Sequence, residues 1–238
     1  MARYYYGCDE VSQGWERYYE SCNAIELDLE SFKEQPKLET LNRWRVESPR
    51  NFCFMLHVPT ALSEYFGQAA GDPPESAEDY PDEVREAWEW TLERTGALAA
   101  KAIVFPTPQE VTPGKGHRQR LAAFADDFVD EIGPEVLWEP KGLWTPDQTT
   151  DFADEIGFVP VFDPFIAHRD EYEFSHGDVA FAISERPGMR RQFDLFDFKE
   201  LLRWTEKYDR VFAMVRGRNK WTHVQQLKLA VEQSVVAD

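Results

Sequence analysis

Eight short apolar runs, most of them followed by a pattern typical of an amphipathic helix, constrain the fold of this chain more than any other feature of its sequence. Runs such as Phe52–Val58 (FCFMLHV) are apolar without alternation, which is typical of parallel strands that are covered on both faces. Regular alternation of such strands with helices indicates an α/β barrel. We therefore expect a single (β/α)8 TIM-like barrel in which residues 1–238 form one domain.

The predicted strands are expected to pair in parallel, in sequence order, and to close into a ring. They are Arg3–Gly7, Ala24–Leu29, Phe52–Val58, Ala102–Phe105, Val136–Trp138, Phe158–Phe162, Val179–Ile183 and Val211–Val215.

Helix-end signals separate these strands. Residues 60–80 form the longest segment that we expect to be irregular, because glycine, proline and acidic residues interrupt it. A helix is expected to begin with Pro81 and to be capped by Gly96. Capping boxes are predicted at Thr145 to Gln148 and at Asp197 to Glu200.

The charge of the chain bears on its partners. Its 44 acidic and 26 basic residues give a net charge of −18, which repels phosphate backbones and anionic lipid. We therefore expect no nucleic acid and no membrane as partners, and the sequence assigns neither a cofactor nor an oligomeric state. The acidic excess also fits adaptation to high salt; an ordinary acidic protein is the alternative.

The cysteines and the N-terminus point to a reducing compartment. Cys8, Cys22 and Cys53 are odd in number and lack C-x-x-C spacing, so we interpret them as reduced thiols. The first residues, MARYYYGCDE, contain no long apolar stretch of the kind found in a secretory signal. These features predict a cytoplasmic protein.

Several motifs resemble the barrel proteins of the DUF72 or YecE type. The resemblance runs through YYGC (Tyr5–Cys8), IELDLESF (Ile25–Phe32), Phe52–Pro59 and WEPKGLW (Trp138–Trp144). It implies a TIM-like barrel and no particular reaction. His57 stands where that family commonly has Lys, and the family's R-L-H-G stretch is not recognisable in AFAISERPG near the seventh predicted strand.

Barrel enzymes carry their active sites at the C-terminal ends of the strands, so polar residues at those ends are the candidates here. We assign Glu26, Glu139 and His57 as catalytic candidates, because two carboxylates in different environments can act as a general acid and a general base. Candidate ligand-binding residues are Lys141, Trp15, Trp144, Asp163, Arg216 and Asn219; further polar residues near strand ends are Cys8, Asp9, Asp28, Thr107 and Glu185.

Each candidate has a plainer explanation. Glu26 and Glu139 could be neutralised by Lys141 or Arg216 and only stabilise the barrel. Glu26, His57, Glu139 and Asp163 could bind Mn, Mg or Zn, but no local ligand spacing supports this, and we assign no metal. His117, His168 and His223 are expected to be solvated, and Arg216, Arg218 and Lys220 fit either a phosphate site or a solvated basic patch.

Two classes of function remain open. The first is an enzyme that acts on a small phosphorylated or sugar-like ligand, with Glu26 and Glu139 as acid and base and with Lys141 and Arg216 binding an anion. The second is a barrel that binds a ligand or a protein without turnover, which the altered motifs near the seventh and eighth strands favour.

Overall fold

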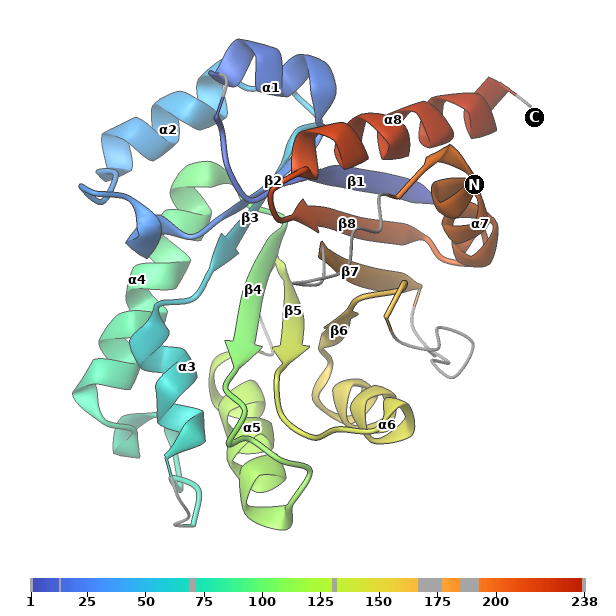
Figure 1. Cartoon of the computed structure of the whole chain (residues 1–238). Coiled ribbons are helices and arrows are strands. Elements are labelled where there is room, and N and C mark those ends of the chain that lie inside the picture. The colour runs from blue at the N-terminus through green and yellow to red at the C-terminus, as the bar shows by residue number, and fades with distance from the viewer. Residues whose placement is uncertain are drawn as a thin grey trace.

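In the computed structural model, which describes residues 2–12, 14–68, 72–129, 132–166, 177–184 and 193–236, parallel strands close into a barrel in the order β1 to β8 (Figure 1). The predicted (β/α)8 barrel is therefore confirmed, together with its strand order. The strands are β1 (Arg3–Cys8), β2 (Ala24–Leu27), β3 (Cys53–His57), β4 (Ala102–Thr107), β5 (Glu135–Pro140), β6 (Val159–Phe162), β7 (Asp178–Ser184) and β8 (Arg210–Arg216).

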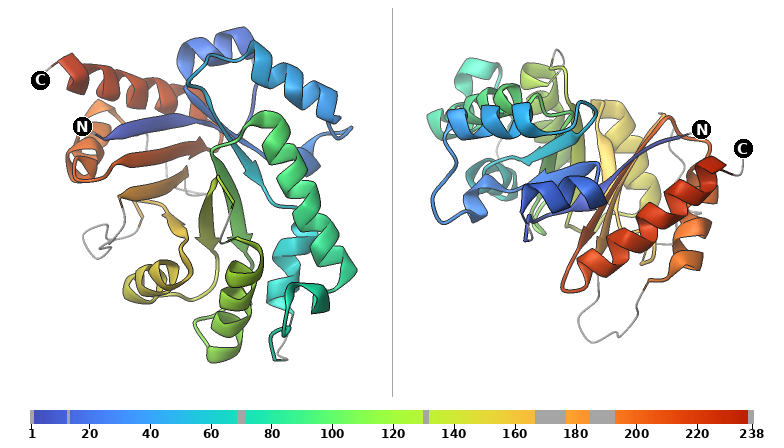
Figure 2. Two further views of the ribbon diagram at one scale, coloured as in Figure 1. Left: turned by 180° about the vertical axis from the view of Figure 1, so that it is seen from behind. Right: turned by 90° about the horizontal axis from the view of Figure 1, so that it is seen from above.

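The helices lie outside this ring in each view (Figures 1 and 2). They are α1 (Trp15–Ser21), α2 (Leu38–Glu47), α3 (Thr60–Gly67), α4 (Asp82–Leu98), α5 (Lys115–Phe128), α6 (Pro146–Ile156), α7 (Leu195–Thr205) and α8 (Lys220–Val236), with short 3-10 turns at Leu29–Ser31 and Ala77–Asp79. None of the described helices has the length and apolar character needed to cross a membrane.

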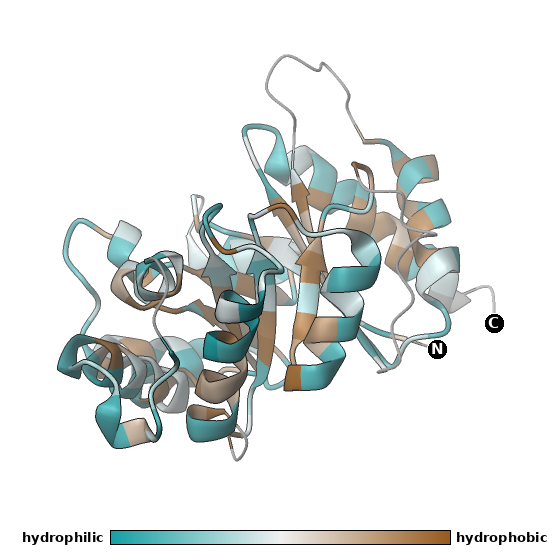
Figure 3. Ribbon diagram, turned by 90° about the horizontal axis from the view of Figure 1, so that it is seen from below, coloured by the Kyte–Doolittle hydropathy of each residue, from teal (hydrophilic) through white to brown (hydrophobic). Residues whose placement is uncertain are grey.

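Alternation along the strands divides the core into two layers. One layer fills the barrel and includes Tyr5, Met55, Leu137 and Phe212, and the rings of Tyr5 and Phe212 stack at 5.2 Å. The other layer lies between the strands and the helices. In Figure 3 the strands are largely hydrophobic, and the helices carry both hydrophobic and hydrophilic residues.

Charged residues close the N-terminal end of the barrel. The Arg210 guanidinium donates from Nε to Asp178 at 2.9 Å and also pairs with Glu135. Nearby, Lys101 Nζ donates to the Tyr5 hydroxyl at 3.2 Å. These side chains occupy the N-terminal end, so the C-terminal face is where a ligand site is expected in such a barrel.

A tyrosine from α1 completes the contact between β1 and β2, which pair only through Gly7–Ala24 and Cys8–Ile25. The Tyr18 hydroxyl accepts from the Cys8 N–H at 2.8 Å and lies 2.8 Å from the Ala24 carbonyl oxygen. A Cβ at residue 7 would lie 1.9 Å from that same carbonyl oxygen, so glycine is required where the two strands approach each other.

Some local predictions are confirmed and others are wrong. The Thr145–Gln148 capping box is present, but α7 is capped by Asp194 with Asp197 at its third position, one turn earlier than predicted. The segment expected to be irregular begins with α3, whose Leu62 and Phe66 are buried. Pro81 is the N-cap of α4 rather than its first residue, and Ala99 rather than Gly96 ends that helix in the left-handed conformation.

Candidate functional site

Four charged or titratable side chains meet at the C-terminal end of the barrel. Glu26 lies on β2, His57 ends β3, Glu139 lies near the end of β5, and Arg216 ends β8. Each lies two residues beyond a side chain of the inner apolar layer, so alternation turns it toward the barrel axis. The strands therefore bring together residues that lie 31 to 190 positions apart in the sequence.

Arg216 is the centre of this cluster. Its Nε donates to Glu26 Oε2 at 3.2 Å, and its Nη2 also contacts Glu26 Oε1. The same guanidinium donates to Glu139, from Nη1 to Oε1 at 2.8 Å and from Nη2 to Oε2 at 3.1 Å. One planar cation thus binds two carboxylates, each through both of its oxygens.

These contacts keep Glu26 and Arg216 charged. Burial alone would raise the pKa of Glu26, which is 2% exposed, but Arg216 and His57 lower it to about 2. Burial would likewise lower the pKa of Arg216, but Glu26 and Glu139 raise it. Near neutral pH, Glu26 is therefore a carboxylate and cannot donate a proton.

Glu26 also fixes the ring of His57. His57 Nε2 contacts Glu26 Oε1, and an ionised carboxylate can only accept, so Nε2 carries a proton. Within the described part of the chain, His57 Nδ1 has no hydrogen-bond partner, and the side chain is 19% exposed. This leaves Nδ1 as the atom of the cluster that can exchange a proton with a ligand.

The charge balance of the cluster bears on what can bind there. One guanidinium between two carboxylates leaves one excess negative charge while the imidazole is neutral. Hydroxyl groups can donate to these carboxylates, whereas an anion would be repelled. Among the residues that the structure describes, no group of three or more metal-ligating side chains is found, and Arg216 takes the position between the carboxylates that a metal ion would need.

Lys141 does not join the cluster. It lies on the loop after β5 with an exposed side chain, and its backbone N–H donates to Thr107 at 3.1 Å. Of the two cations that the sequence offered for neutralising Glu26 and Glu139, Arg216 is the one that pairs with them. The sequence indicated a place for Arg216 at this end of the barrel, since Arg216 directly follows the apolar run of β8.

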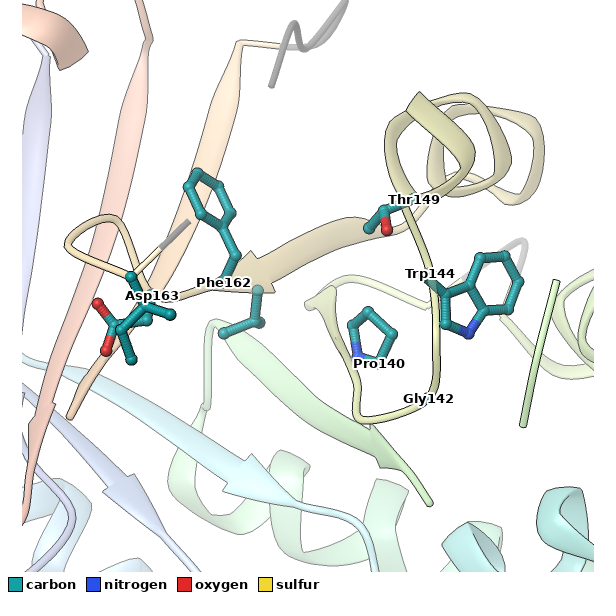
Figure 4. Close-up of a pocket in the computed structure, with 8 residues that line it drawn as sticks. Pro140, Gly142, Trp144, Thr149, Phe162 and Asp163 are labelled. Atoms are coloured by element: carbon teal, nitrogen blue, oxygen red, sulfur yellow. The ribbon is translucent and has the colours of Figure 1, made fainter. Parts of the chain in front are cut away.

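Asp163 and Trp144 lie to one side, at a pocket of about 200 Å³ between the end of β6 and the loop after β5 (Figure 4). Asp163 accepts from the backbone N–H groups of Phe165 at 2.9 Å and Ser184 at 3.0 Å. The Trp144 ring stacks on Phe152 at 5.5 Å. These residues form a second part of the same face.

The remaining predicted ligand-binding residues lie apart from the carboxylates. Trp15 packs against Trp44 at 5.0 Å and Phe54 at 6.3 Å, in the layer outside the barrel. Asn219 lies just before α8, with an exposed side chain and a carbonyl that accepts from the His223 N–H at 3.1 Å.

Several other residues considered from the sequence are buried or ion-paired. Cys8 is buried, and a hydrogen bond with Cys22 together with burial raises the pKa of its thiol, which does not suit a nucleophile. Lys220 pairs with Asp9 and Glu10, at 2.7 Å each. The expectation that His223 is solvated is wrong, because this residue of α8 is completely buried. Glu185 and His168 lie outside the described residues.

Comparison with known proteins gives structural matches only. No family model and no curated protein sequence matches the chain. A DUF72 family protein from Enterococcus faecalis has a TM-score of 0.71 at 16% identity, covering 98% of each chain. One from Thermotoga maritima has a TM-score of 0.69 at 12% identity, covering 97% of this chain and 99% of the other. The chain has the fold of the DUF72 barrels.

This DUF72-like barrel also resembles more distant structures. A xylose isomerase domain containing protein from Salmonella typhimurium has a TM-score of 0.59 at 14% identity, covering 99% of this chain and 97% of the other. Identities this low establish the architecture alone. The sequence resemblance to DUF72 proteins is thus confirmed in the fold, and the chemistry has to be argued from the cluster around Arg216.

Proposed function

We propose that this chain is a divergent DUF72-like enzyme that transfers a proton to or from a small, sugar-like ligand at the C-terminal face of the barrel. The observation that carries the proposal is the contact between His57 and Glu26. A buried carboxylate that holds one ring nitrogen of a histidine leaves the other nitrogen oriented for general acid–base catalysis.

Each member of the cluster has a distinct role in this proposal. His57 exchanges the proton through Nδ1, and Glu26 remains ionised and positions the ring. Glu139, 16% exposed, accepts a hydrogen bond from a ligand hydroxyl. Arg216 keeps Glu26 charged and also pairs with Glu139. Because its pKa is low, Glu26 cannot be the general acid that was considered from the sequence.

The ligand class follows from the charge of the cluster. Its excess negative charge favours hydroxyl groups and disfavours a phosphate at the centre. A phosphate on the ligand would instead meet Lys141 and Arg218, which are exposed on loops after β5 and β8. The centre thus supports a polyhydroxylated ligand, with any phosphate held at the rim.

A ligand-binding barrel without turnover is the second candidate. The observation that favours it is the way Arg216 contacts all four oxygens of Glu26 and Glu139. Such a network can serve stability and leave only a binding surface.

Thermal-shift screening of aldoses, ketoses and their phosphates, followed by NMR detection of C–H exchange in D2O, separates the two candidates. We expect a ligand that raises the melting temperature and exchanges a C–H proton faster with enzyme than without. His57→Asn should keep the binding and slow the exchange by about 10²-fold or more. His117→Asn, which alters a histidine half-buried at the start of α5, is the control. Binding without exchange would support the second candidate, and no binding would contradict both.

A further inference from the structure

A second group of charges lies at the other end of the barrel, where the strands begin. Arg3 is the first residue of β1 and lies in register with Arg210, the first residue of β8, while Lys101 directly precedes β4. The Arg3 N–H donates to the carbonyl of Asp209 at 2.8 Å, and the carboxylate of Asp209 lies beside Gly177. Three cations thus lie at this end of a chain whose net charge is −18.

Only one of these cations is neutralised by the carboxylates beside it. Arg210 donates to Asp178 at 2.9 Å and also pairs with Glu135. Within the described part of the chain, Arg3 and Lys101 have no carboxylate partner. These three cations and two carboxylates therefore carry one excess positive charge.

The two cations without a carboxylate lie against one buried ring. Lys101 Nζ is 4.8 Å from the centre of the Tyr5 ring, and Arg3 Cζ is 5.1 Å from the same centre. Tyr5 is 3% exposed, and its ring is held by stacking on Phe212. Its hydroxyl accepts from Lys101 Nζ at 3.2 Å, and among the described residues its own O–H has no acceptor. A guanidinium, an ammonium and a hydroxyl group therefore each have a proton left to donate beside this ring.

The field at this end of the barrel is positive although the chain as a whole is acidic. Burial raises the pKa of the nearby Cys53 thiol to about 12, while Lys101, Arg3 and Arg210 act to lower it. Exposed charges more than about 8 Å away are largely screened at physiological ionic strength. The local cations, and not the distant carboxylates, therefore decide which ions bind here.

We infer that the N-terminal end of the barrel binds a phosphate ion through Arg3, Lys101 and the hydroxyl of Tyr5. A phosphate ion has several oxygens, so it can accept from the planar guanidinium, from the ammonium and from the hydroxyl at once. Its negative charge also offsets the repulsion among the cations gathered there. The site lies at the opposite end of the barrel from the cluster around Arg216, so the inference does not depend on the proposed function.

Inorganic phosphate itself is the probe. It is titrated into the full chain near neutral pH, and binding is followed by ³¹P NMR of the phosphate. The ionic strength is held constant with KCl, because an acidic chain also responds to salt that is not bound at a particular site.

Exposed side chains supply the variants. Arg3→Gln removes a charge from an exposed side chain at little cost to folding. Lys101→Met keeps a long apolar side chain beside Tyr5 and removes the ammonium. We expect each to weaken phosphate binding about tenfold or more, since each removes a charged donor. Lys33→Met, at an exposed position before α2, removes a lysine charge elsewhere and should leave the binding unchanged.

The outcomes decide between this site and its alternatives. Saturable binding that Arg3→Gln and Lys101→Met weaken, and Lys33→Met does not, supports the inference. No saturable binding to the unmodified chain, or equal weakening by Lys33→Met, overturns it. If Lys141→Met weakens the binding and Arg3→Gln does not, the phosphate binds at the C-terminal face, and the inference is overturned as well.

Discussion

The guanidinium of Arg216 donates to both carboxylate oxygens of Glu26, although the two residues lie 190 positions apart in the sequence. Glu26 lies on β2 and Arg216 on β8, with β1 between them in the ring. The same guanidinium reaches Glu139 on β5. Arg216 therefore connects distant strands at the mouth of the barrel and lowers the pKa of Glu26, the carboxylate that contacts His57.

Glu26→Gln should change how stability depends on pH. The pKa of Glu26 falls from 4.5 to about 2 on folding, which corresponds to roughly 3 kcal/mol. Because the folded pKa is the lower one, this contribution is present above pH 4.5 and is lost as the pH falls toward 2. Urea unfolding should show the variant well below the unmodified chain at pH 7, with the difference closing between about pH 5 and pH 2. Glu34→Gln, at an exposed loop position, should show a small difference at every pH; parallel curves for Glu26→Gln would refute the assignment.

Glu139→Gln should separate function from stability. Glutamine keeps the volume and can still accept from Arg216, which remains paired with Glu26. We expect unfolding to change by about 1 kcal/mol, while binding or turnover of a ligand found in the screen is lost. If the variant instead loses about 3 to 5 kcal/mol and binds the ligand unchanged, Glu139 only stabilises the barrel.

Two adjacent tyrosines test the contact between β1 and β2. Tyr18→Phe removes the hydroxyl that accepts from the Cys8 N–H and lies beside the Ala24 carbonyl, so it should cost about 1 to 3 kcal/mol. The Tyr19 hydroxyl is buried without a partner among the described residues, so Tyr19→Phe should be neutral or stabilising. Equal losses for the two variants in urea unfolding would show that the Tyr18 hydroxyl has no special role.

Salt should reveal whether the acidic surface is an adaptation. With a net charge of −18, the carboxylates repel one another and are screened by added ions. If the chain is salt-adapted, the melting temperature should rise steeply between about 0.1 and 2 M KCl. A flat melting temperature would leave an ordinary acidic protein.

The barrel and the convergence of several polar residues at one end of it were predictable because the ends of the strands are clear in this sequence. Apolar runs such as Val211–Val215 match the paired strands closely, since a parallel strand covered on both faces has no reason to alternate. Glu26, His57, Glu139 and Arg216 each stood at or near the end of such a run, and closure of the ring brings strand ends together.

The pairing within the site was not predictable in the same way. Lys141 and Arg216 are both cations next to strand ends, but the chain turns through Pro140 and Gly142, which removes Lys141 from the alternation. Arg216 is the last residue of β8 and keeps the inward direction of Met214. Only the geometry of the turn distinguishes them.

The predictions of some helix ends and of one buried helix face were wrong for related reasons. Asp194 and Asp197 each have an acidic residue three positions later, so both fit a capping box, and in the structure Asp194 is the cap. Leu62 and Phe66 have the spacing of a helix, but the glycines and prolines that follow them led to the prediction of an irregular segment. His223 lies beside Val224 on a buried part of α8, which charge and hydropathy alone did not reveal.

The measurement that tests the proposed site most directly is the ¹⁵N NMR spectrum of the His57 ring across the neutral pH range. The contact with ionised Glu26 predicts that Nε2 carries the proton of the neutral ring, and that Nδ1 is the nitrogen that responds to an added ligand. In Glu26→Gln this preference should weaken, because a glutamine side chain can donate as well as accept. A ring whose Nε2 loses its proton while Nδ1 keeps one, in the unmodified chain, would contradict the proposed role of His57.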